Sequence, residues 1–376
     1  MSMCSRVLAV AFAGAMALAG QDVPLDLHSS IDIKLPPDSP VALLNTNVRD
    51  SGATQRGGAM VIDLHMALSL RNSDSRTIRG ITLLVTAQEV TPGGKASVAV
   101  PSLNVAPGQA FPVRIDLRLL RPLQAGAGPL VQVSLDGVLF EGLGFYGPNR
   151  LNSQRSMTVW EMEADRDRKY FKSVIASAGP EALRHEMLDS LARQEERPRI
   201  DVRLSRGGRS VTSAAEPERM ARFAFLKMPE APVEAIDGWA EVAGNEARTP
   251  TIQIQNRSPR PVRHVEIGWI VKDRDGHEFL AGSVPAAEGD VLLSPGQKGR
   301  VLQHTALRFS RSAGEPVSIA SMTGFVSNVE FADGRVWVPS RASLPAMAPP
   351  SPEEQRLADL YRTKGLAAVV EELRKY

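Results

Sequence analysis

One stretch of this chain occurs twice, and the two copies align residue for residue. Residues 71–85 lie over residues 255–269 without a gap, and the copies share one asparagine and two arginines. A second landmark also repeats, because residues 105–109 match residues 293–297 through a common Pro-Gly-Gln sequence. Duplication on this scale predicts two related domains. The shared residues are of the types found in turns and cores, so the repeat predicts architecture rather than chemistry.

Length and charge agree with this prediction and narrow the class of protein. A chain of 376 residues is long for a single hydrophobic core. Its composition, 43% hydrophobic and 23% charged, is that of an ordinary globular protein. The formal net charge of +2 disfavours a nucleic-acid-binding protein and a strongly anionic partner.

The first twenty residues have the pattern of a secretory signal peptide. Arg6 precedes an apolar run over residues 7–19, and Ala17-Leu18-Ala19 forms a small-x-small cleavage site. We therefore expect residues 1–20 to be removed and the protein to be extracytoplasmic, either periplasmic or secreted. No other segment approaches eighteen apolar residues, so no stable membrane insertion is expected after cleavage. The single cysteine, Cys4, lies before the apolar run, and the processed protein would contain no disulfide.

Two long regions show the alternation that is typical of antiparallel strands. Apolar and polar residues alternate in short runs bounded by Gly, Pro, Asn and Asp over residues 40–150 and again over residues 222–342. A polar leader, residues 21–39, precedes the first region and contains one candidate edge strand. The fold class predicted is mainly β, with two antiparallel immunoglobulin-like β-sandwich domains. Eight matching positions are predicted to lie in the cores: Ile81, Leu83, Val85, Ala87, Val265, Ile267, Trp269 and Val271.

The repeated asparagines and Pro-Gly pairs are predicted to form turns. Asn72 and Asn256 each follow an apolar strand, and asparagine closes such loops through side-chain hydrogen bonds to nearby backbone. Pro107-Gly108 and its copy at 295–296 suit the two central positions of a type II turn.

The periodicity changes to that of helices in two places. Residues 157–196 carry an apolar stripe with helical spacing and predict a helical hairpin that turns at Gly179. The charged run 161–169 is interpreted as a solvated helix surface. Residues 197–221 are predicted to be a flexible loop, and residues 343–352 a Pro-rich linker. A capping box that starts at Ser351 predicts a C-terminal helix over residues 353–376, with a break at Gly365.

One acidic hairpin and one polar strand face are the candidate ligand sites. Asp273, Asp275 and Glu278 have calcium-like oxygen spacing, but D-x-D-G between two strands is also a plain hairpin turn. We therefore expect no metal there. His264 and Glu266 share the strand face opposite the core and are expected to lie on an exposed surface. The sequence predicts no catalytic residue and no cofactor.

The order of these elements resembles bacterial extracytoplasmic immunoglobulin-like modules of the FxLYD and CARDB kind. The resemblance is carried by Asn72 and Pro107-Gly108 in the first copy, and in the second by a set of turn residues, Asn256, Ser258, Asp273, Gly276, Pro295 and Gly296. It covers about residues 55–115 and 245–305. It implies a spacer or interaction platform without catalytic residues.

The function expected from the sequence is that of a non-enzymatic interaction or structural module of the cell envelope. Its partner would be another envelope or secreted protein. A helical stripe of Leu366, Val369, Val370 and Leu373 requires burial, either against the helix's own domain or, as the candidate partner surface, against another protein.

The alternative is a carbohydrate-binding or glycan-active module that uses exposed aromatic side chains. The candidates are Trp239, Trp337 and Tyr146. Two acidic residues across a cleft beside an aromatic platform would favour this alternative.

Overall fold

The computed structural model describes residues 22–24, 30–56, 58–89, 93–123, 128–205, 217–312, 314–341 and 350–376. The predicted signal peptide, most of the predicted linker and the middle of the predicted loop lie outside these residues. Strands make up 47% and helices 22%, so the protein is mainly β, as predicted. The chain divides into two compact units. Unit 1 takes residues up to Ser75, Thr82–Ala99 and Pro107–Asp136, and unit 2 takes Arg76–Ile81, Val100–Ala106 and Gly137–Tyr376.

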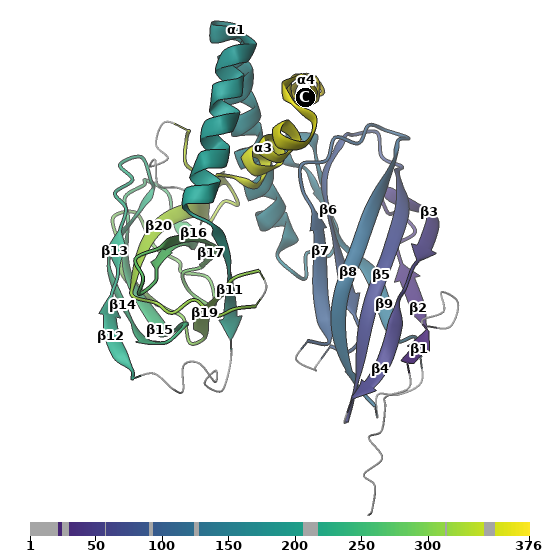
Figure 1. Cartoon of the computed structure of the whole chain (residues 1–376), viewed down its shortest axis with the longest axis horizontal. Helices are drawn as coiled ribbons and strands as arrows, with labels where there is room; N and C mark the ends of the chain where they lie inside the picture. The colour runs from purple at the N-terminus through teal and green to yellow at the C-terminus, as the bar shows by residue number, and fades with distance from the viewer. Residues whose placement is uncertain are drawn as a thin grey trace, which may run out of the picture. The chain divides into compact units, whose positions relative to one another are not determined.

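The first ten strands belong to the first half of the chain and form two five-stranded sheets (Figure 1). They are β1 (Asp22–Pro24), β2 (Ile31–Lys34), β3 (Val41–Val48), β4 (Gly52–Arg56), β5 (Ala59–Asn72), β6 (Ile78–Thr86), β7 (Lys95–Val100), β8 (Ala110–Pro122), β9 (Val131–Phe140) and β10 (Phe145–Tyr146), with a 3₁₀ turn at Glu141–Leu143. The first sheet has the order β1-β4-β5-β3, with β8 paired to β5. The second has the order β10-β9-β6-β7, with β2 added to β9 as a parallel strand from the leader.

The long strand β5 shows why this half of the chain forms sheets. Its alternate residues Ile62, Leu64, Met66, Leu68 and Leu70 are all buried, as the period-two pattern predicts. The strand pairs with β8 over its whole length from Ala59 to Arg71. Burial of one face therefore fixes the register of the central strand.

The described residues after 196 form an eleven-stranded sheet in unit 2. Its strands are β11 (Arg199–Ser205), β12 (Arg219–Arg222), β13 (Ala224–Phe225), β14 (Val233–Ala243), β15 (Glu246–Asn256), β16 (Val262–Lys272), β17 (Glu278–Pro285), β18 (Lys298–Leu302), β19 (Ala306–Ser310), β20 (Ser321–Phe331) and β21 (Val336–Trp337). The order is β12-β14-β15-β19-β11-β17-β16-β20-β13, with β18 on β15 and β21 on β20. Side chains from both halves of this order share one hydrophobic core.

The prediction of a flexible loop at 197–221 is wrong at both ends. Strand β11 pairs antiparallel with β19 over Asp201–Ser205 and parallel with β17 at Arg199 and Ile200. It therefore joins the two halves of the sheet. Strand β12 pairs with β14. The sequence of β11 does alternate, with Ile200, Val202 and Leu204 between polar residues, so the signal for this strand was present and was overlooked beside the unpatterned residues that follow it.

The eight predicted core positions are confirmed. Seven of them are at most 1% exposed and Ala87 is 8% exposed. Trp269 lies between Phe223 and Phe225, with ring-centroid distances of 4.9 and 6.4 Å.

The two copies of the repeated stretch form the same turn. Asn72 and Asn256 are both fully buried. The backbone N–H of each donates to the glutamine carbonyl of its Pro-Gly-Gln sequence at 3.0 Å, and each Oδ1 accepts the backbone N–H two residues later at 2.9 Å. Gly108 and Gly296 have φ of 76° and 74°, as the third residue of a type II turn requires. The predicted turn role of the asparagines is confirmed.

A second contact is also duplicated. The guanidinium of Arg76 lies 3.7 Å from the ring centroid of Phe140, and that of Arg260 lies 5.6 Å from the ring centroid of Phe331. These two arginines are one of the pairs that the repeats share, and both aromatic rings are buried. The shared arginines therefore stabilise the end of each repeat through cation–π contacts.

Helices α1 (Ser153–Glu196), α3 (Pro352–Lys364) and α4 (Leu366–Arg374) belong to unit 2. Helix α1 is interrupted at Gly179, whose φ of 83° and ψ of 178° are not helical, and its two arms share one hydrophobic cluster with α3 and α4 (Figure 1). Helix α3 begins at the predicted cap, where Ser351 Oγ accepts the backbone N–H of Glu354 at 3.1 Å. The predicted break at Gly365 separates α3 from α4. No described helix is long and apolar enough to cross a membrane.

Candidate functional site

The predicted partner surface is wrong, because unit 2 covers it. Val369 and Leu373 are buried against α1 and α3, and Leu366 and Val370 pack partly buried against the same cluster. The apolar stripe therefore packs within unit 2, with Leu366 and Val370 left partly exposed.

The aromatic side chains named for glycan binding do not form a platform. Trp239, Trp337 and Tyr146 lie on β14, β21 and β10, and each is only partly exposed. The ring of Trp239 is covered by the Arg300 guanidinium, 5.4 Å from its centroid, and Trp337 packs against the core of unit 2.

The acidic hairpin brings together a different set of side chains from the one predicted. Ligand atoms of Asp273, Asp275 and His277 lie within 4.8 Å of one another. Glu278 instead forms an ion pair with Arg197 at 2.9 Å. Asp273 Oδ1 accepts the backbone N–H groups of residues 275 and 277 at 3.0 and 2.8 Å, which is the bonding of a tight turn.

Millimolar calcium or zinc is therefore expected to leave the melting temperature of the protein unchanged. Oxygen ligands for calcium number six or more, and the turn already occupies one oxygen of Asp273 with two backbone hydrogen bonds. Differential scanning calorimetry with calcium, zinc or EDTA checks this. A rise of several degrees with calcium that Asp275→Asn abolishes would show that the hairpin is a metal site.

A cavity of about 320 Å³ lies elsewhere in unit 2, between the first arm of α1, the sheet and the start of α3. Strands β16, β17 and β20 and the first residue of β11 form its sheet side, and residues 350–352 close another side. Its wall contains one indole, two carboxylates, one amide, one guanidinium and several hydroxyls. The residues that carry these groups include Trp160, Glu163, Arg199, Glu266, Ser283 and Asn328.

The face of β16 that was expected to be exposed forms part of this wall. His264 is only 4% exposed, and the side chain of Glu266 is 21% exposed. Glu266 Oε2 accepts hydrogen bonds from Ser283 Oγ at 2.6 Å and from Asn328 Nδ2 at 3.1 Å. The expectation of a solvated face is wrong because α1 covers this side of the sheet, which strand alternation cannot reveal.

The two carboxyl groups of the cavity have opposite pKa shifts. Burial raises the pKa of Glu163 to about 7, and the neighbouring carboxylates of Asp167 and Glu266 act in the same direction against Arg166. Burial also acts to raise the pKa of Glu266, but the nearby His264 and the hydrogen bonds from β17 and β20 hold that pKa below its ordinary value. The cavity therefore contains one ionised carboxylate and one carboxyl group that changes charge near neutral pH.

Asn328 is the polar group of the wall with an unmet hydrogen bond. Its side chain is 1% exposed, its Nδ2 is bonded to Glu266, and its Oδ1 has no partner among the described residues. That oxygen has almost no solvent-accessible area, so the missing hydrogen bond, a cost of about 1–3 kcal/mol, lies in the packing behind the cavity wall.

Glu163→Gln is expected to stabilise the protein at pH 8 and to change little at pH 4. A carboxyl group whose pKa is raised on folding keeps its proton in the folded chain, so stability falls as the pH rises from about 4.5 towards 7. Glutamine stays neutral and avoids this loss, which is roughly 1–3 kcal/mol. Urea denaturation at pH 4, 6 and 8 checks this, with Glu195→Gln at an exposed position of the same helix as the control. A gap between the Glu163 variant and wild type that does not grow with pH would contradict the burial of this group.

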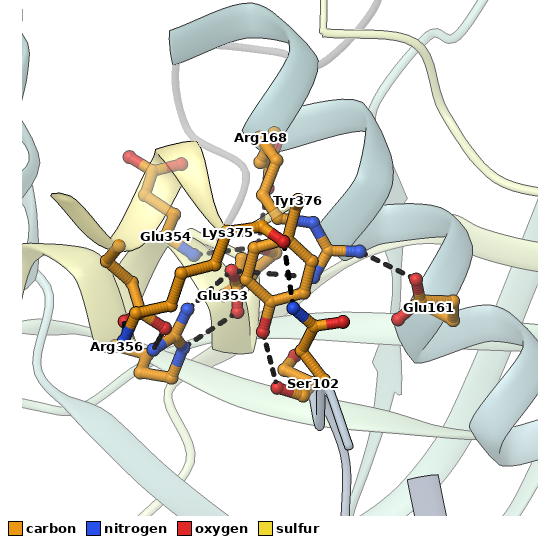
Figure 2. A network of polar contacts seen from close by, with 12 residues as sticks. Ser102, Glu161, Arg168, Glu353, Glu354, Arg356, Lys375 and Tyr376 are labelled. Carbon is orange, nitrogen blue, oxygen red and sulfur yellow. Dashed lines mark hydrogen bonds and ion pairs between the residues drawn. The ribbon is translucent and has the colours of Figure 1, made fainter. Parts of the chain in front are cut away.

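A buried network of charges fixes the helices that enclose the cavity (Figure 2). Arg168, 3% exposed, donates to Glu161 at 2.6 Å and lies 3.6 Å from Glu353 of α3. Its guanidinium stands 4.1 Å from the ring centroid of Tyr376, whose hydroxyl donates to the Ser102 carbonyl at 2.8 Å. The C-terminal residue of the chain and the Val100–Ala106 segment of unit 2 therefore meet at this network.

A second branch of the network reaches the cavity itself. Asp167 is fully buried, accepts from Arg166 at 2.8 and 2.9 Å, and also accepts from Ser351 Oγ, whose residue lines the cavity. Glu354 is paired with Arg193 at 2.7 Å and with Arg341. Charged groups on α1 and α3 therefore hold the cavity wall in place.

The interpretation of residues 161–169 as a solvated surface is wrong for three of its members, since Glu161, Asp167 and Arg168 are buried. A signal for this was present in the sequence. Asp167 lies three residues after Ala164 and four before Phe171, so it shares the apolar stripe of the helix. A charged residue on an apolar stripe predicts a buried ion pair, although not its partner on another helix.

No family model and no curated protein matches the chain. Among solved structures, the chain is similar to a β-glucosidase from Kluyveromyces marxianus, with 10% identity over 72% of this chain and 45% of that chain and a TM-score of 0.17. It is also similar to red sea bream transglutaminase, with 8% identity over 77% of this chain and 31% of that chain and a TM-score of 0.13. The chain spans less than half the length of both proteins. Likenesses with TM-scores this low establish no common fold and carry no argument about function.

Proposed function

We propose that this protein is a non-enzymatic binding module of the cell envelope and that it binds a small ligand in the cavity of unit 2. The observation that carries the proposal is the composition of the cavity wall, in which two carboxyl groups, a guanidinium, an amide and an indole come together. Ligand sites of proteins combine apolar walls with a few placed polar groups, and a volume of about 320 Å³ lies within their usual range.

The architecture we propose is a pair of immunoglobulin-like β-sandwiches similar to the FxLYD and CARDB modules. Two observations support it: the identical hydrogen bonds at the two buried asparagines and the duplicated arginine–aromatic contact. Modules of this kind act as platforms in envelope proteins. In the second repeat, α1 and the start of α3 pack beside the sheet, and the cavity lies between these helices and the strands.

Export is part of the proposal, and it predicts a defined N-terminus. When the gene is expressed with its own start, mass spectrometry of the soluble protein is expected to find a chain that begins at about residue 20 to 22. Arg6 and the Ala17-Leu18-Ala19 sequence are the reason. An intact Met1 in a membrane fraction would contradict export.

Ligand binding is tested by screening a library of small polar metabolites against the full-length protein with saturation-transfer NMR. A hit is expected to lose its signal with Ser327→Trp, because this substitution fills the cavity from β20. Ser321→Trp is the matched control, since it adds the same side chain at an exposed position of the same strand. If compounds bind the Ser327→Trp variant as they bind the wild-type protein, or if no compound binds the wild-type protein, the proposed site is wrong.

A further inference from the structure

We propose that the cavity accepts one uncharged, polyhydroxylated ring of the monosaccharide class. This inference rests on the proposed function and names the chemistry of its ligand. It is drawn from the wall of the cavity rather than from the exposed aromatic side chains, which are separated from one another in the fold.

The polar part of the wall offers donors and acceptors side by side. The two carboxyl groups accept hydrogen bonds, while the Arg199 guanidinium and the hydroxyls of Ser156 and Ser327 can donate. A sugar hydroxyl both donates and accepts, so a ring with several hydroxyls satisfies such a mixture at many orientations. An anion would leave the acceptors unsatisfied, and an alkyl ammonium would leave the donors unsatisfied.

The apolar part of the wall is suited to the C–H face of a ring. Trp160 lines the cavity from α1 and is partly exposed, and Val159, Phe325 and Pro352 extend the apolar surface. A flat indole gives large contact area at little cost in side-chain entropy and keeps its N–H available for a hydrogen bond. The volume of about 320 Å³ lies at the lower end of the range for ligand sites, which favours a single ring over a chain of rings.

The charges of the wall disfavour anionic ligands. Glu266 and the guanidinium of Arg199 carry opposite charges on the same wall, and Glu163 adds a second carboxylate as the pH rises past its pKa of about 7. A uronic acid would bring its carboxylate close to that of Glu266, and such like-charge contact weakens binding.

The test is isothermal titration of full-length protein at pH 7.5 with neutral hexoses, N-acetylhexosamines, hexuronic acids, amino sugars and inorganic phosphate. A neutral sugar is expected to bind at least tenfold more tightly than its uronic acid. Trp160→Ala is expected to weaken that binding at least tenfold, and Trp160→Phe to retain most of it. Trp239→Ala, which removes a tryptophan outside the cavity, is expected to change it less than twofold. Thermal unfolding of each variant confirms that the chain is folded.

The outcomes separate this inference from the proposed function. If another class of metabolite binds, and Ser327→Trp abolishes that binding while no neutral sugar binds, the sugar assignment is wrong and the binding function stands. If neutral sugars bind but Trp160→Ala has no effect, the sugar site lies elsewhere and this inference is wrong. If no ligand of any class binds the wild-type protein, both fail.

Discussion

Trp269→Ala is expected to destabilise unit 2 by about 3–5 kcal/mol, the cost of truncating a large buried aromatic side chain. Trp269 is 1% exposed and is among the largest fully buried side chains of the protein. Its ring makes edge contacts with Phe223 and tilted contacts with Phe225, so the truncation also removes an aromatic cluster. Urea denaturation followed by far-ultraviolet circular dichroism measures the loss.

Trp239→Ala is the matched control, because that tryptophan lies on the same sheet but is only partly buried. Its loss is expected to be about 1 kcal/mol or less. Equal losses at the two tryptophans would show that Trp269 contributes no more to the core than the partly buried Trp239 does.

Glu353→Ala is expected to cost about 1.5–3 kcal/mol, because it removes charge-assisted hydrogen bonds from a buried network, although Arg168 keeps Glu161 and Arg356 keeps Glu372 as partners. Glu353 is 1% exposed and accepts from Arg356 at 2.8 and 2.9 Å (Figure 2). It also lies 3.6 Å from Arg168, whose side chain is 4% exposed. Calorimetric unfolding of the full-length variant measures the loss. Glu353→Gln keeps the shape but not the charge, and we expect it to retain most of the destabilisation.

Asp359→Ala on the same helix separates this effect from a general sensitivity of α3. Asp359 is paired with Arg362 at 2.6 Å, and both side chains are more than half exposed, at 53% and 64%. An exposed pair contributes about 0–1 kcal/mol, so the control is expected to stay within that range. A Glu353 variant as stable as the Asp359 variant would mean that the buried network does not fix the helices.

Several elements could be predicted because their signals are local. The duplicated turns, the eight core positions, the cap at Ser351 and the breaks at Gly179 and Gly365 each depend on residues within a few positions of one another. Turn chemistry, helix capping and alternation act over that range, so the sequence contains the complete cause.

Two wrong predictions, for the polar face of β16 and for the charged run 161–169, share one physical origin: packing between elements that are far apart in the sequence. Alternation in β16 shows that His264 and Glu266 lie opposite the core, but it does not show that α1 covers that face. The charges at 161–169 have a pattern compatible with a solvated helix, and only the packing of α3 against α1 shows that some of them are buried. Strand β11 is a different case, because Ile200, Val202 and Leu204 alternate with polar residues in the sequence, and the structure adds only its hydrogen-bonded partners β17 and β19.

The sequence by itself determined the duplication, the mainly β class, the turns and the cores, because each arises from short-range patterns of apolar residues and turn formers. Only the tertiary structure decided the site. Trp160, Glu266 and Asn328 lie on three elements more than sixty residues apart along the chain, and they line one cavity only after the sheet and helices have packed. Burial then raises the pKa of Glu163, while His264 and the hydrogen bonds from Ser283 and Asn328 lower that of Glu266 against the effect of burial, and both results depend on what surrounds each group in space.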